Sequence, residues 1–145
     1  MLKLFLIFSF LFQSGFYEGG WITEVLKDNF SLNFYIDGRY LKKYHNTGGH
    51  GTIISYTLVE SNAHFVIANV VNANFDFETW PEASRKEIGN RVRKTGIKDG
   101  NYWRTDCFYI KGESGRLCLL HGYGKDSLTI NKIMDTAHVE DKQFK

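Results

Sequence analysis

The sequence predicts a mainly β domain, a small antiparallel β-barrel or sandwich of seven to eight strands with one or two short helices. Aromatic residues make up 16% of the 145-residue chain, and such side chains favour pleated, half-buried surfaces. Fourteen glycines and a single proline fit many tight turns better than a proline-rich linker. Short apolar or alternating segments recur at the spacing of about 8–12 residues that is typical of all-β domains.

The chain opens with a segment that is typical of export signals. Lys3 precedes an apolar run over residues 4–12, and small residues follow from Ser14. This order matches a secretory signal peptide, and the run is shorter than the roughly 20 residues that span a membrane. We therefore predict a signal peptide over residues 1–15, a single domain over residues 16–145, and a secreted or periplasmic location. The alternatives are a buried first strand or helix and an uncleaved anchor.

The first clear strand covers residues 30–36, where polar and apolar side chains alternate. One predicted face holds Phe30, Leu32, Phe34 and Ile36, and the other holds Ser31, Asn33 and Tyr35.

Turn residues divide the segments that follow. The pair Asp37-Gly38 supplies the positive φ of a type I′ hairpin turn, so residues 39–44 are the predicted return strand. Residues 52–60 and 63–71 are two further predicted strands, joined at Ser61-Asn62. Residues 74–80 alternate again and predict another strand.

The pattern then changes to one that predicts a helix over residues 82–94. Thr79 and Glu82 have the spacing of a capping box, Pro81 suits a first helical turn, and Gly96 provides the stop. The basic residues of this segment are Arg85, Lys86, Arg91, Arg93 and Lys94. We interpret them as a solvated face, with an acidic partner as the alternative.

A hairpin with two cysteines is predicted from residues 102–110 and 116–123. If this hairpin turns about Gly112-Glu113, Cys107 faces Cys118 at a separation that a disulfide spans. In an exported chain an even number of cysteines favours pairing, so we predict a Cys107–Cys118 disulfide, with two buried free thiols as the alternative.

The remaining residues predict a last strand and a short helix. Asp99-Gly100 is a turn, residues 128–134 are the predicted strand, and Asp135 is the predicted cap of a C-terminal helix that ends near residue 144.

Two short motifs resemble those of the lipocalins and other calycins. Gly19-Gly20-Trp21 is similar to the Gly-x-Trp signature of that family, which also opens avidin-like barrels. Thr105-Asp106 is similar to its Thr-Asp-Tyr element, with Cys107 in place of the tyrosine. The resemblance implies an up-and-down barrel that Trp21 closes at one end, around an apolar ligand cavity.

Other chemistry has little support in the sequence. The net charge of +2 is too small to imply binding to nucleic acid or to an acidic membrane surface. No Gly-x-Ser-x-Gly motif occurs, and glycine-rich residues 48–51 are neither a P-loop nor a dinucleotide fingerprint. His45 and His50 share one loop, with His64 and His121 elsewhere in the chain. We interpret the pair on the loop as polar loop residues, with metal binding or acid–base catalysis as the alternative. We predict no catalytic residue, no metal and no cofactor.

These observations predict an exported binding protein for a small apolar ligand. Trp21 is expected in the core, and the predicted ligand-binding residues are Phe30, Leu32, Phe34, Ile36, Trp80 and Trp103. One alternative is an exported module that binds another protein, such as an inhibitor, immunity factor or secreted effector. A hydrolase that uses His and Asp is a less favoured alternative. An aromatic-lined cavity favours the ligand, whereas a solid core with an exposed aromatic patch favours a protein partner. No integral membrane association is expected after signal cleavage.

Overall fold

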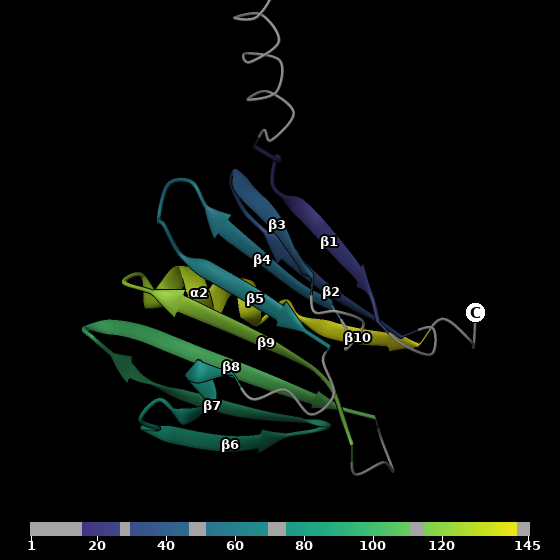
Figure 1. The fold of residues 1–145 in the computed structure, drawn as a ribbon, viewed down its shortest axis with the longest axis vertical. Helices are drawn as coiled ribbons and strands as arrows, with labels where there is room; N and C mark the ends of the chain where they lie inside the picture. The colour runs from purple at the N-terminus through teal and green to yellow at the C-terminus, as the bar shows by residue number, and fades with distance from the viewer. Residues whose placement is uncertain (1–15, 27–29, 47–51, 70–74, 111–114, 142–145) are drawn as a thin grey trace, which may run out of the picture.

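The computed structural model describes residues 16–26, 30–46, 52–69, 75–110 and 115–141. Within them the chain folds into two antiparallel sheets and one α-helix (Figure 1). The predicted mainly β class is confirmed, and the sheets form a sandwich-like arrangement rather than a closed barrel. The predicted signal peptide, His50 and the predicted turn at Gly112-Glu113 lie outside the described residues.

The larger sheet has seven strands among the described residues, in the order β3-β4-β5-β9-β8-β7-β6. Its strands are β3 (Tyr40–Asn46), β4 (Thr52–Leu58), β5 (His64–Ala68), β6 (Ser84–Ile88), β7 (Arg91–Lys98), β8 (Asn101–Tyr109) and β9 (Arg116–Gly124). All neighbours pair antiparallel, and β3 and β6 are the two edges.

The smaller sheet joins the two ends of the described chain. It consists of β1 (Gly20–Val25), β2 (Phe30–Ile36) and β10 (His138–Asp141), with β2 in the middle. Helix α2 (Ser127–Met134) packs against β2, β8 and β9. The 3₁₀ helix η2 (Asp76–Thr79) lies in the connection between β5 and β6.

Strand β2 has the two faces that the alternation predicted, but burial does not alternate along it, because Ser31 and Asn33 of the polar face are buried as well. Leu32, Phe34 and Ile36 are fully buried in the core between the sheets, and Phe30 packs against that core. Gly38 has the expected positive φ, at +102°. The predicted hairpin is wrong, however, because β2 and β3 belong to different sheets, so Asp37-Gly38 leads from one layer to the other.

The helix predicted over residues 82–94 is wrong. Strands β6 and β7 form a hairpin there, with Gly89 at a φ of +60° in its turn. The apolar side chains of this segment were too few for a helix to bury a face, whereas an edge hairpin leaves charged side chains in water. The strand predicted at residues 74–80 is also wrong, because the described part of it forms η2.

The strand predicted at residues 128–134 is helix α2. Ile130, Ile133 and Met134 are buried at the i, i+3, i+4 spacing of one helical face. Asp126 caps the start of the helix by accepting hydrogen bonds from the Thr129 backbone N at 3.1 Å and from its Oγ1 at 2.6 Å. Asp135 therefore ends a helix rather than starting one. Within the described residues no helix is both long and apolar enough to cross a membrane.

The predicted disulfide is wrong, because the register of β8 and β9 separates the cysteines. Cys107 lies opposite Leu119 and Cys118 lies opposite Phe108, so the two thiols are on opposite faces of the sheet. Both cysteines are free and buried. Burial raises the pKa of both thiols, that of Cys118 to about 12.

Thiol titration of the denatured, unreduced protein is expected to find two free sulfhydryls, because neither face of the sheet holds both sulfur atoms. The reduced protein serves as the control and should give the same number. A titration that finds no thiol before reduction would contradict the observed register.

A buried ion cluster connects the β7–β8 end of the larger sheet to α2. The Asp106 carboxylate is fully buried and accepts hydrogen bonds from Arg104 Nη2 at 2.9 Å, Arg91 Nη1 at 3.2 Å and Arg93 Nε at 3.2 Å. Arg104 Nη1 also lies 2.7 Å from Asp135 Oδ1 at the end of the helix. Three guanidinium groups therefore share one buried carboxylate as an ionic partner.

A second cluster connects the two sheets at their other end. Glu24 of β1 accepts hydrogen bonds from the Tyr56 hydroxyl and from Lys42 Nζ, the latter at 2.6 Å. Burial and this hydrogen bond to Glu24 raise the pKa of Tyr56. The carboxylate of the smaller sheet is therefore held by β3 and β4 of the larger one.

Candidate functional site

The structure divides the predicted ligand-binding residues between two faces of the larger sheet. Phe30, Leu32, Phe34 and Ile36 belong to the core that the two sheets and α2 enclose. Trp103 is fully buried but faces the other side of β8, where Trp80 packs edge-on against it at 6.3 Å between ring centroids. The sheet itself lies between the two groups, so these residues do not form one site.

The connection between β5 and β6 covers the side of the sheet that holds Trp103. Phe77 of η2 stacks on the ring of His121 with centroids 4.0 Å apart and planes 11° apart. Trp80 packs against the same histidine at 5.3 Å and against Tyr123 at 5.0 Å. Aromatic rings therefore close over the middle of β8 and β9 as a second, smaller apolar layer.

His121 is the buried titratable group of this layer. It is 3% exposed, and its Nδ1 lies 2.7 Å from the Thr105 hydroxyl. Burial lowers the pKa of His121 to about 3, so its imidazole is neutral at physiological pH. A base this weak is poorly matched to proton transfer near neutral pH.

A small pocket lies beside Trp103, between β7, β8 and η2. Its volume is about 40 Å³, and its lining includes Phe77, Lys94, Thr105 and Cys107. That volume holds a few water molecules, since one water needs roughly 10–15 Å³ of such space. The indole Nε1 of Trp103 is buried without a hydrogen-bond partner. The space beside Trp103 is far smaller than the roughly 300 Å³ at which ligand pockets begin.

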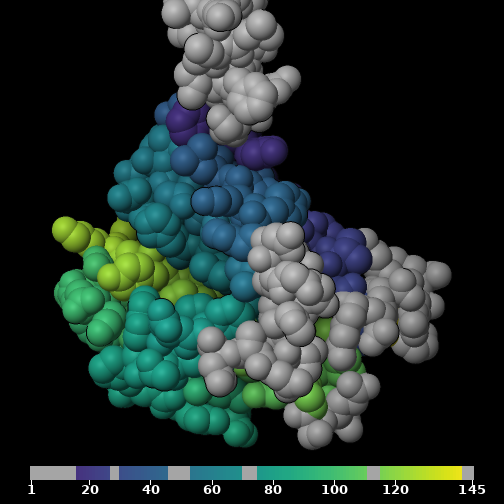
Figure 2. Space-filling view, in the orientation of Figure 1, coloured from purple at the N-terminus to yellow at the C-terminus, as the bar shows by residue number. Residues whose placement is uncertain are grey.

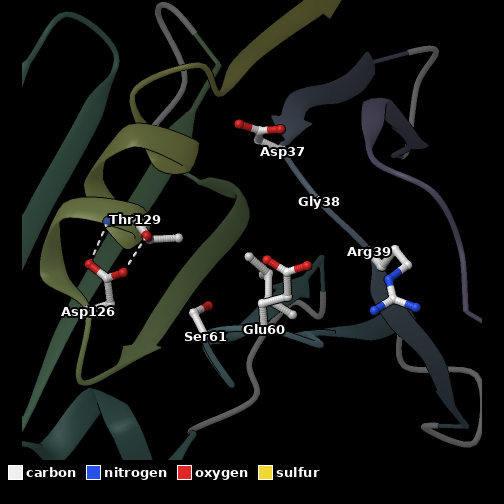
Figure 3. Close-up of a pocket in the computed structure, with 8 residues that line it drawn as sticks. Asp37, Gly38, Arg39, Glu60, Ser61, Asp126 and Thr129 are labelled. Atoms are coloured by element: carbon white, nitrogen blue, oxygen red, sulfur yellow. Dashed lines mark hydrogen bonds between the residues drawn. The ribbon is translucent and has the colours of Figure 1, made fainter.

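A larger pocket, of about 350 Å³, is polar (Figure 3). Its carboxylates come from the β2–β3 connection, the β4–β5 turn and the start of α2, at Asp37, Glu60 and Asp126. Asp126 is used as the helix cap, and Asp37 Oδ2 lies 3.6 Å from Lys132 Nζ. Nowhere in the described ranges do three or more His, Cys, Asp or Glu side chains come together to hold a metal ion.

His45, predicted to lie in a loop, is instead on β3, while His64 is on β5 and His121 on β9. His45 Nε2 lies 3.1 Å from the Ser55 hydroxyl, and His64 Nδ1 lies 3.0 Å from the Thr57 hydroxyl, both at exposed positions. His121, in contrast, is in the interior. Of the described histidines, His138 meets a carboxylate, with its Nε2 3.2 Å from Glu140 Oε1, but the contacts of His45, His64 and His121 bring no second histidine to that pair.

The outer face of the smaller sheet carries an aromatic patch, formed by Trp21, Tyr35 and His138. Trp21 and Tyr35 are directly opposite each other on β1 and β2, with ring centroids 5.6 Å apart, and His138 of β10 lies 5.8 Å from Trp21. Trp21 is 63% exposed and Tyr35 39%. The expectation that Trp21 packs in the core, and closes a barrel, is therefore wrong.

Polar side chains and one aliphatic side chain surround the aromatic patch on this face. Thr23 Oγ1 donates to Asn33 Oδ1 at 2.6 Å, and Asn33 Nδ2 donates to Ser31 Oγ at 3.3 Å. Val25, opposite Ser31, is 70% exposed. Ser31 and Asn33 are buried, at 0% and 8% exposure, so the exposed side chains of this face include Trp21, Tyr35 and Val25, beside Thr23.

The sequence predicted the position of one residue of this patch. Tyr35 was expected on the face of β2 that also holds Ser31 and Asn33, and the structure confirms that division. Trp21 was missed because the strand over Gly20–Val25 was not predicted. His138 was missed because its pairing with Asn33 joins segments far apart in the chain.

No family model, curated protein or solved structure matches this chain. The resemblance to lipocalins therefore stays a prediction.

Proposed function

We propose that this chain is an exported module that binds another protein through the aromatic patch of its smaller sheet. The observation that carries the proposal is the exposure of Trp21 beside Tyr35. A lone exposed aliphatic side chain is ordinary on a protein surface. Trp and Tyr, however, dominate the binding energy of protein interfaces when they lie at the centre of a contact surrounded by polar groups.

The geometry favours a protein partner over a small apolar ligand. The side chains predicted to line a cavity are packed into the core, and the pocket beside Trp103 holds only a few waters. Strand pairing, in contrast, holds Trp21 and Tyr35 directly opposite each other on one face of the sheet. A rigid aromatic pair of this kind presents a large contact area and loses little conformational entropy on binding.

The test places a photo-crosslinking amino acid at position 21 of the full chain, in the cells that produce it. A protein adduct is expected in the exported fraction after irradiation. The matched control carries the same amino acid at position 128, since Leu128 is 81% exposed and lies on α2 rather than on this face. An adduct that forms equally from both positions, or from neither, would argue against the proposed patch.

With the crosslinked protein purified, Trp21→Ala is expected to weaken binding by at least about 2 kcal/mol, roughly thirtyfold in Kd. Leu128→Ala should change Kd by less than about twofold. Because both side chains are exposed, neither substitution should lower the melting temperature appreciably. Saturable binding of an apolar fluorescent probe that quenches tryptophan would instead favour the small-ligand alternative.

A further inference from the structure

The β6–β7 hairpin is strongly basic, which sets it apart from the rest of the chain. Residues 84–98 contain six basic side chains and one carboxylate, so the hairpin has a net charge of +5 in a chain whose total is +2. The remaining residues therefore carry −3. Such a separation of charge directs anionic partners to one end of the molecule. Figures 1 and 2 show the hairpin at the lower border of the molecule.

Part of this charge is already neutralised within the fold. Arg91 and Arg93 of β7 bind the buried Asp106, and Lys94 Nζ lies 3.3 Å from Glu82 Oε1. Arg85 and Lys86 of β6 are exposed and have no ionic partner among the described residues. Lys98, at the end of β7, also has no ionic partner among the described residues. Two of the three available positive charges are therefore on the outermost strand, next to Glu87.

Strand β6 is also an open edge. It is the last strand of the larger sheet, and β7 is its only strand partner in the described part of the chain. An unpaired row of backbone N–H and C=O groups is a template for an added strand. Positive side chains on that edge repel a second copy of the same edge and favour a strand of opposite charge.

We propose that β6 binds an extended acidic segment of another protein, which adds to the larger sheet as a further strand. The arrangement of charges favours a strand over a membrane surface. Arg85 pairs with Lys94 on one face of the hairpin, and Lys86 pairs with Arg93 on the other. A membrane contacts one face, whereas a strand beside the edge reaches both. This inference does not depend on the aromatic patch.

The probe is a labelled nonapeptide with blocked ends, in which consecutive central glutamates are flanked by valines, so that an added strand carries glutamate on both faces. It is titrated into the full chain at low salt. Saturable binding is expected by fluorescence anisotropy. Two further peptides are methylated on alternate backbone nitrogens. One carries the methyl groups on the odd-numbered residues and the other on the even-numbered residues. One methylated peptide should bind roughly tenfold more weakly, because its methyl groups face β6 and remove the N–H donors. The other should bind like the parent, because its methyl groups face away.

Reversing the two available charges of β6, with Arg85→Glu and Lys86→Glu together, is expected to weaken binding at least about tenfold, since attraction becomes repulsion. The matched control is Lys43→Glu with Lys132→Glu, the same change of charge at exposed positions on β3 and α2, and it should shift Kd less than about twofold. Thermal unfolding checks that both proteins fold.

Two outcomes would overturn the inference. One is no binding of the acidic peptide at low salt. The other is equal binding of all three peptides together with saturable binding to vesicles of anionic lipid, which would assign the hairpin to an anionic surface. Neither outcome bears on crosslinking from position 21, so failure of this inference and failure of the proposed function are distinguishable.

Discussion

Replacing Asp106 by alanine is expected to destabilise the protein by about 3–5 kcal/mol, because it leaves Arg104, Arg91 and Arg93 around a vacated buried position. Burial alone would raise the pKa of the Asp106 carboxyl, but the hydrogen bond and charge of Arg104, followed by those of Arg93, hold that pKa below its usual value. The carboxylate is thus the charged form that the fold requires. Urea unfolding of wild type and variant measures the difference in free energy.

Asp135→Asn is the matched control for Asp106. It removes a carboxylate from the same arginine cluster, but the Asp135 side chain is 60% exposed. A salt bridge with so exposed a partner contributes about 0–1 kcal/mol, so this variant should unfold close to wild type. Equal losses from both substitutions would mean that the buried carboxylate has no special role.

Acidification from pH 6.5 towards pH 3 is expected to remove on the order of 4 kcal/mol of stability through His121 alone. Burial lowers the pKa of His121 to about 3 in the folded protein, against an ordinary value of 6.5. Below pH 6.5 the unfolded chain binds a proton that the folded chain does not. The stabilisation is therefore complete above pH 6.5 and is lost as the pH falls.

His121→Gln tests this, since an amide oxygen can still accept a hydrogen bond from Thr105 but does not titrate. The variant should lose less stability than wild type between pH 6.5 and pH 4, whatever its stability at neutral pH. The matched control is His64→Gln, because exposed His64 makes the same kind of contact with Thr57. If the free energy of unfolding of His121→Gln falls with pH as steeply as that of wild type, His121 is not the group responsible for the loss of stability.

The sequence predicted the elements whose pattern is local. The alternation over Phe30–Ile36 identified both faces of β2. The turn at Asp99-Gly100 was placed correctly, although the segment before it was predicted as a helix and is strand β7. Residues 128–134 were ambiguous, because a short apolar run suits a strand as well as a helix. Their helical form depends on the burial of Ile130 and Met134 against the sheet, which is a tertiary effect.

The local sequence pattern did not predict which strands pair or in which register. A slip of one residue places Cys107 and Cys118 on opposite faces, and the irregularity between Phe108 and Tyr109 shows how readily the register shifts there. The helical signals at Thr79 and Pro81 were outweighed by the pairing of β6 and β7. For the candidate site, Tyr35 was placed on the right face, whereas Trp21 required knowledge of the strand that carries it.

The position of β10 has a consequence for the order of folding. Strand β2 has two partners: β1, which immediately precedes it, and β10, which pairs His138 with Asn33 at the far end of the chain. Closing so long a loop slows folding, since its entropy is lost before the contacts form. During synthesis the smaller sheet stays incomplete until residues 138–141 have been added, long after β2 has been made. Until then β2 keeps one unpaired edge, through which nascent chains can associate with one another.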